Sequence, residues 1–275
     1  MAVTESNGAG AKYANVNLTP DATPYDSVLF QDIVRQLEEV ENGQIREVAP
    51  AIVASTALSS GSMLCAQHRG DSLPKLFRDV TTDKDDEEVK ALFATFRTAL
   101  TLIWPFIGLP QCVPASLGLV GEMRERDIFM TDQMDRPFLS EANWHQKGLE
   151  TRKTIYRTAA NSEVMNMMGG FFPELTYMTH AVVFGFVIGG SEKTQGLPLC
   201  ETIIAGAVAA LGATRQTKTH FKGAMGLGIS AAAVQAVWQA AEQVAEWNGG
   251  KLPAQIDVAA LADEVGMRLE SRGRM

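Results

Sequence analysis

The chain has few of the residues that build metal and redox sites. Its 275 residues contain three cysteines, Cys65, Cys112 and Cys200, and four histidines, His68, His145, His180 and His220. The cysteines are scattered, odd in number and form neither a CxxC pair nor a zinc-ligand spacing, so they predict no disulfide framework and no redox dithiol. The histidines are not paired at helical spacing, which argues against a zinc site. We therefore expect neither a metal nor a cofactor.

Long apolar runs and basic clusters are also missing. The longest uncharged apolar stretches, residues 181–190 and 203–213, have about half of the roughly 20 residues that span a bilayer. The formal charge is −8, and no run of lysine and arginine offers the phosphate contacts that nucleic-acid binding needs. The opening MAVTESNGAGAKYANV contains no apolar core of the kind found in signal peptides. We expect a cytoplasmic protein that binds neither membranes nor nucleic acids.

What the sequence does contain is apolar residues at helical spacing. This pattern predicts a helix from residue 27 that stops at Gly43, a helix over about residues 45–59, a helix after the acidic segment 81–88, and another after a Ser230 cap. Alternating strand patterns are scarce. Residues 1–25, rich in Gly, Asn, Thr and Pro, predict a poorly ordered arm. The sequence predicts an all-α fold of at least ten helices.

Two segments of the chain resemble each other. Trp104-PFIG-Leu109-Pro110-QC-Val113 matches Trp247-NGGK-Leu252-Pro253-AQ-Ile256 at an offset of 143 residues. Upstream, ALSSGSMLCAQH, ending at His68, resembles ALGATRQTKTH, ending at His220. These matches predict a duplicated helical unit, with an N-terminal repeat over residues 26–125 and a C-terminal repeat over residues 126–275 that carries the site.

The stretch from Glu201 to His220 contains the strongest chemical signal. An Ala-rich apolar helix begins near Glu201, Gly212 interrupts it, and a second short helix presents Gln216 and His220 four residues apart, on one face. This arrangement predicts a pocket in which His220 transfers protons, Glu201 orients and supports it, and Gln216 binds a substrate oxygen. Glu201 can instead be a first-turn acid favoured by the helix dipole. A pocket histidine contributes little packing, so the fold should survive its loss.

The order of these residues resembles the carboxymuconolactone decarboxylase family, whose relatives include alkylhydroperoxidase D. The resemblance includes a Gly-x-Glu-x-Arg helix from Gly148 to Arg152 and an aromatic helix with Phe184-Gly185 before the acid–histidine pair. It covers residues 140–260 well. The peroxidase branch places a CxxC 12 and 15 positions after the acid, where this chain has Ala213 and Gln216. The resemblance therefore implies the decarboxylase chemistry and disfavours the peroxidase chemistry.

The function that this resemblance implies is cofactor-independent decarboxylation of a carboxylated cyclic compound, lactone or polyketide-like. We expect Arg152 to hold the substrate carboxylate, with Trp144 and Phe184 also contacting substrate; the alternative for Arg152 and Trp144 is simple exposure to solvent. An isomerase or cyclase using the same pocket, and a non-catalytic helical binding protein, stay open as alternatives. His68 lacks an acid 19 positions before it and is interpreted as structural or vestigial.

The expected assembly also follows from the resemblance. Single-copy relatives form trimers or hexamers, so a duplicated chain is expected to form a dimer or a trimer. The Met- and Phe-rich stretch over residues 164–172 is a candidate for the buried contact.

Overall fold

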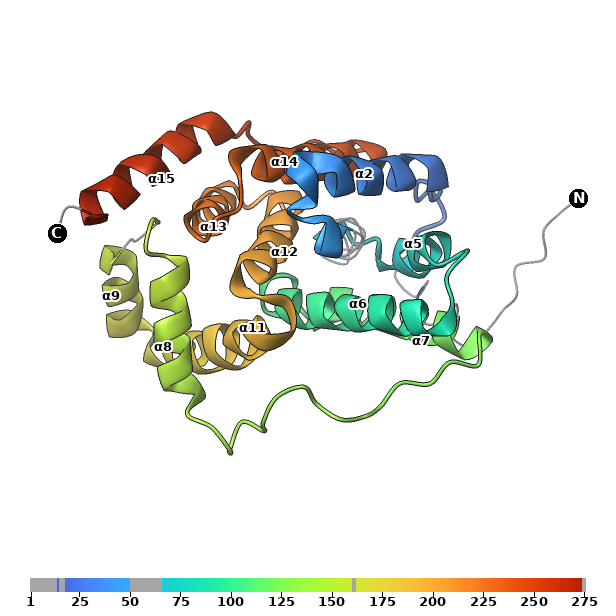
Figure 1. The fold of residues 1–275 in the computed structure, drawn as a ribbon, viewed down its shortest axis with the longest axis horizontal. Helices are drawn as coiled ribbons and strands as arrows, with labels where there is room; N and C mark the ends of the chain where they lie inside the picture. Colours follow the sequence, from blue (N-terminus) through green and yellow to red (C-terminus); the bar gives the residue numbers. More distant parts are fainter. Residues whose placement is uncertain (1–13, 15–17, 50–65, 160–161, 274–275) are drawn as a thin grey trace, which may run out of the picture.

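The computed structural model describes residue 14 and residues 18–49, 66–159 and 162–273, which form helices and connecting segments with no β-strand among them (Figure 1). The all-α prediction is confirmed, and the described helices exceed the ten predicted. Most of the predicted arm and most of the predicted helix over residues 45–59 lie outside the described residues.

The first half of the chain contains α2 (Ser27–Glu39), the short 3₁₀ turns η1 (Val40–Gly43), η2 (Arg46–Val48) and η3 (Gly70–Ser72), α5 (Leu73–Val80), α6 (Asp86–Ile107) and α7 (Leu109–Glu125). An irregular segment over residues 126–143 follows. The second half contains α8 (Trp144–Ile155), α9 (Ser162–Phe171), α10 (Pro173–Met178), the π-helix η4 (Thr179–Gly189), α11 (Gly190–Gln195), α12 (Leu197–Ala210), α13 (Thr214–Gly226), α14 (Ala231–Trp247) and α15 (Val258–Gly273).

Several helices begin where the sequence signals them. The Ser230 side chain accepts a hydrogen bond from the Ala233 amide at the start of α14, as predicted. Asp85 and Glu88 form a capping box at the start of α6, where the acidic segment was expected to supply a first turn. Such caps satisfy backbone amides that have no partner within the helix, which fixes the starting residue.

Helix α12 lies at the centre of the molecule, surrounded by α6, α11, α13 and α14 (Figure 1). Every residue from Cys200 to Ala210 is buried. Most of these side chains are small or β-branched, so the neighbouring helices can pack closely around α12. Gly212, at a φ of +74°, then turns the chain into α13, because glycine adopts this conformation without steric cost.

A second close contact lies between α8 and η4. A Cβ atom at Gly148 would lie 1.8 Å from the His180 carbonyl oxygen, and one at Gly185 would lie 2.0 Å from the Trp144 carbonyl oxygen. Any larger residue at either position would push the two elements apart. The two glycines therefore set how closely α8, which carries Arg152, lies against the rest of the protein.

The hydrophobic core continues through both halves of the chain. One cluster of buried residues extends from Phe30 in α2 to Val265 in α15. Helix α12 of the second half packs against α6 of the first, and α14 packs against α2. The boundary predicted at residues 125 and 126 thus separates two parts of the sequence that share one core.

The predicted duplication is not established by the fold and stays a prediction. Leu109 and Pro110 begin α7, whereas Leu252 and Pro253 lie in the irregular segment between α14 and α15, so the two matched segments differ in local structure. A different likeness, which the sequence comparison missed, involves residues 108–112 and 196–200, both Gly-Leu-Pro-x-Cys. Each begins with a glycine at positive φ, 89° and 72°, and starts a helix, α7 or α12.

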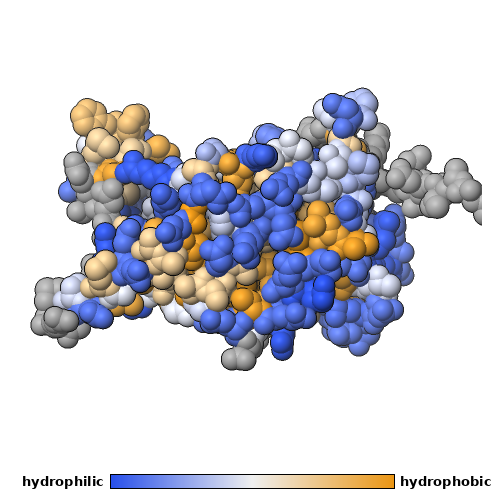
Figure 2. All heavy atoms as spheres, turned by 90° about the horizontal axis from the view of Figure 1, so that it is seen from above, coloured by the Kyte–Doolittle hydropathy of each residue, from blue (hydrophilic) through white to orange (hydrophobic). Residues whose placement is uncertain are grey.

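Within residues 18–49, 66–159 and 162–273, no helix combines the length and the hydrophobicity required to cross a bilayer. The face shown in Figure 2 is largely hydrophilic, with hydrophobic residues in small patches between polar ones. This mixture is typical of a protein surface, on which scattered apolar side chains are normal.

Candidate active site

Glu201 and His220 are joined by a buried hydrogen bond. Glu201 lies in the second turn of α12 and His220 in α13, and their Oε1 and Nδ1 atoms are 2.7 Å apart. Glu201 is completely buried, and His220 is 3% exposed. The carboxylate fixes the orientation of the imidazole and leaves Nε2 as the nitrogen that can act on a ligand. The turn at Gly212 thus brings together the two residues that the sequence paired.

The surroundings of this pair are apolar and tightly fitted. A Cβ atom at Gly223 would lie 2.7 Å from the Glu201 Oε1 atom, so only glycine leaves room for the carboxylate. The ring of Phe106 contacts the His220 ring edge-on, with centroids 5.5 Å apart. Glu201 Oε2 is buried and has no hydrogen-bond partner within the described part of the chain. In such surroundings an unpaired carboxylate is costly, so we expect the loss of His220 to lower the free energy of unfolding; that the fold survives this loss stays a prediction.

His220 forms part of the wall of a cavity of about 230 Å³. The cavity is lined by Arg152, Tyr156, Ala159, Val164, Met165, Arg215, Gln216, Thr219 and His220. Gln216 and Arg152 therefore line the same cavity as His220, and their roles stay predictions. Glu201 is not part of the lining and contacts the cavity only through His220, so it can support the imidazole without touching a ligand.

Arg152 supplies a positive charge to the cavity that no acid among the described residues neutralises. No ion pair in the described regions includes it, and its buried Nε atom has no hydrogen-bond partner. Burial lowers the pKa of the guanidinium from its ordinary value, yet an arginine stays charged. The nearby His180 supplies no negative charge to Arg152. Burial lowers the pKa of His180, and its interactions with Arg152 and His145 lower it further. A partly buried cation that has no ion-pair partner among the described residues is well suited to bind a ligand carboxylate.

Tyr156 is a cavity residue that the sequence analysis missed. It lies between Arg152 and His220: the Arg152 guanidinium is 5.7 Å from its ring centroid, and its ring lies edge-on to the His220 ring, with centroids 6.0 Å apart. Burial raises the pKa of the Tyr156 hydroxyl, and the charge of Glu201 raises it further. The hydroxyl therefore stays protonated and can donate a hydrogen bond. The sequence contained one indication of this role: Tyr156 comes four residues after Arg152, at the end of α8, and residues at this spacing lie on the same face of a helix.

Trp144 and Phe184 do not line the cavity, in contrast to their predicted role in substrate binding. Trp144 is buried against Phe186, and its indole N–H donates to the Phe138 carbonyl oxygen. Phe184 is buried behind Tyr156, with ring centroids 5.5 Å apart. The close contact between α8 and η4 holds both aromatic residues in the core.

His68 and the two described cysteines show no catalytic arrangement. His68 is exposed and lines none of the cavities described here. Cys112 and Cys200 are buried, and Cys65 lies outside the described residues. Burial raises the pKa of the Cys200 thiol, and the charge of Glu201 raises it further. Where the chain is described, no three His, Cys, Asp or Glu side chains form a group able to hold a metal ion. A neutral, enclosed thiol is a poor nucleophile.

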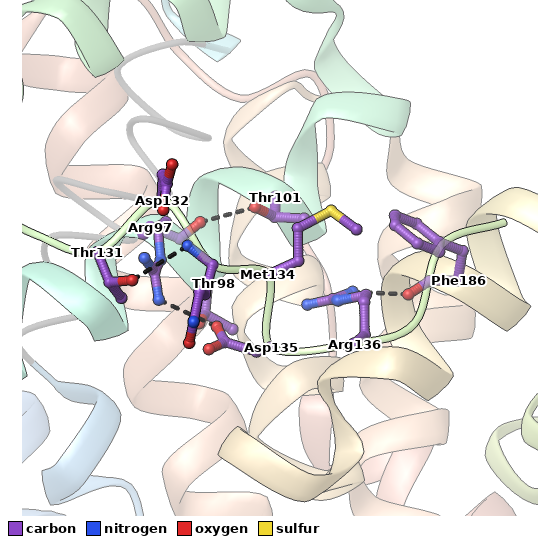
Figure 3. A pocket seen from close by; sticks show the side chains of 10 residues that line it. Arg97, Thr98, Thr101, Thr131, Asp132, Met134, Asp135, Arg136 and Phe186 are labelled. Carbon is purple, nitrogen blue, oxygen red and sulfur yellow. Dashed lines mark hydrogen bonds and ion pairs between the residues drawn. The ribbon is translucent and has the colours of Figure 1, made fainter. Parts of the chain in front are cut away.

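A larger cavity of about 360 Å³ lies between α6 and the irregular segment over residues 126–143 (Figure 3). Its two arginines are engaged by the protein itself: Arg97 pairs with Asp135 at 3.0 Å, and Arg136 donates to the carbonyl oxygens of Phe186 and Val187 at the end of η4. These bonds fix the segment against α6 and η4. We therefore assign this cavity a structural role and place the candidate active site at His220.

The comparisons with known proteins identify no relative. No family model, no curated protein and no solved structure matches this chain. The function must therefore be argued from the residues of the site themselves.

Proposed function

We propose that the protein is a cofactor-independent decarboxylase similar to the carboxymuconolactone decarboxylases, acting on a small carboxylated cyclic compound. The observation that carries this proposal is the buried hydrogen bond between Glu201 and His220 at the wall of a cavity that also contains the unpaired cation Arg152. The first two residues form an acid–base group, and the third provides a binding site for a carboxylate.

The proposed reaction begins with the substrate carboxylate on Arg152. The bond from the carboxyl carbon to the ring breaks, CO₂ leaves, and the electron pair moves into an adjacent carbonyl group to form an enolate. Protonated His220 then donates the proton on Nε2 to the carbanionic carbon, and water returns a proton to the imidazole. Glu201 stabilises the charged imidazole until the proton is transferred.

The enolate oxygen requires hydrogen-bond donors, because the negative charge moves from the carboxylate to this oxygen as CO₂ forms. Gln216 and Tyr156 line the same cavity and can both donate. We assign Gln216 to this oxygen, as the sequence suggested, and add Tyr156 as a second donor.

The carboxylate-binding role of Arg152 gives a direct test. In an assay of CO₂ release from carboxylated lactones and β-keto acids, we expect Arg152→Ala to raise KM at least about tenfold, because a charged hydrogen-bond pair is lost. Lys153→Ala, which removes an exposed charge from the next position of α8, is the matched control. Unchanged KM in Arg152→Ala would contradict the assignment. Turnover of such compounds without CO₂ release would instead indicate an isomerase or cyclase.

An assembly through α9 and α10 is the second part of the proposal. No residue of α10 is buried, and the two helices expose Met167, Phe171, Phe172, Leu175, Tyr177 and Met178. Since contiguous apolar surface of this kind usually marks an interface, we expect a dimer or trimer of this chain by light scattering at micromolar concentration. Phe171→Glu with Leu175→Glu should shift it to a monomer. A monomeric wild type would refute this assembly.

A further inference from the structure

A second cavity, of about 510 Å³, adjoins the candidate active site. It is lined by Ala159, Thr214, Arg215, Lys218, Thr219, Lys222 and Arg268. Ala159, Arg215 and Thr219 belong to the walls of both cavities, so the two spaces lie side by side. A ligand of sufficient length can therefore occupy both.

This second cavity is strongly basic in a protein of net charge −8. Four of its lining residues are cationic, and none is acidic. Lys222 is paired with Glu264 of α15 at 3.1 Å, but no ion pair in the described ranges includes Arg215, Lys218 or Arg268. All three of these side chains are exposed to solvent, where an anion can reach them.

The start of α13 adds to the same positive field. Its N-cap residue, Ala213, has no side-chain oxygen and makes no capping hydrogen bond. Thr214, the first residue of this 13-residue helix, lines the basic cavity. Backbone amides at an uncapped helix start favour an anion, and this helix start lies at the cavity that the unpaired side chains line.

We propose that the basic cavity binds a phosphate group carried by the same substrate whose carboxylate lies on Arg152. A single carboxylate is neutralised by one arginine, and Arg152 already serves that purpose in the first cavity. Three unpaired cations and a helix start suit a group with about two negative charges and three or more acceptor oxygens. The inference rests on the proposed function in one respect, because it assigns both anionic groups to one molecule.

The experiment measures binding by calorimetry, without turnover, using diphosphate, 4-carboxyphenyl phosphate and acetate at matched ionic strength. We expect diphosphate to bind more tightly than acetate, and Lys218→Ala with Arg268→Ala to weaken it at least about tenfold. The control is Arg124→Ala with Lys251→Ala, which removes the same charge from exposed positions elsewhere. Arg152→Ala should weaken 4-carboxyphenyl phosphate and leave diphosphate unchanged.

Each result decides a separate claim. Diphosphate that binds no better than acetate, or that is weakened equally by the control pair, would overturn the phosphate site. If Arg152→Ala leaves 4-carboxyphenyl phosphate unaffected, the claim that one molecule spans both cavities fails. Retained diphosphate binding in a protein without decarboxylase activity would refute the proposed function alone and support the phosphate site.

Discussion

Replacing His220 by glutamine is expected to lower turnover at least about 100-fold, the usual contribution of a positioned acid–base group. The glutamine amide can still donate to Glu201, but it cannot exchange a proton with a substrate near neutral pH. The loss should therefore appear in kcat, with KM changing little because Arg152 is intact. The measurement is the rate of CO₂ release at saturating substrate, together with a thermal melt to show that the fold is retained.

The matched control is His145→Gln. His145 stacks on Tyr177, with ring centroids 5.2 Å apart, and lies outside the cavity lining. We expect this variant to keep nearly full activity. Full activity in His220→Gln would disprove the proposed mechanism, and the acid–histidine pair would then be a structural element of the core.

Replacing His220 by alanine is expected to destabilise the protein by about 3–5 kcal/mol, the usual cost of leaving a buried carboxylate without its partner. The alanine leaves Glu201, which is completely buried, with neither carboxylate oxygen in a hydrogen bond within the described structure. It also removes the ring contacts with Phe106 and Tyr156. Urea unfolding with a constant m-value measures this loss.

A second substitution separates the charge from the packing. Glu201→Gln in the His220→Ala background should recover at least about 1–2 kcal/mol, because burying a neutral amide costs less than burying an unpaired carboxylate. Glu201→Gln in the native background should change the free energy of unfolding by much less, since the amide keeps one bond to His220. Purely additive effects of the two substitutions would show that the pair is not coupled.

Much of the fold was determined by local sequence. Helix starts such as the Asp85 capping box and the Ser230 cap depend on residues three positions apart, and the apolar spacing along each helix is equally local. The contact between Glu201 and His220 was predictable for the same reason, because only the turn at Gly212 separates their helices. The predicted roles of both residues in catalysis, and the duplication, stay predictions.

Only the tertiary structure decided what surrounds this pair. Trp144 was predicted to contact substrate, with exposure to solvent as the alternative, but it is buried, because Gly148 and Gly185 let α8 lie against η4. Arg152 of α8 and His220 of α13 line one cavity. The spacing of residues along the sequence does not predict that the buried Nε atom of Arg152 has no described hydrogen-bond partner. Arg268 is 53 positions beyond Arg215, and the packing of α15 on α13 places both on one basic cavity. Sequence periodicity determines which face of each helix is buried, whereas the free energy of packing determines which faces meet and which charges remain unpaired.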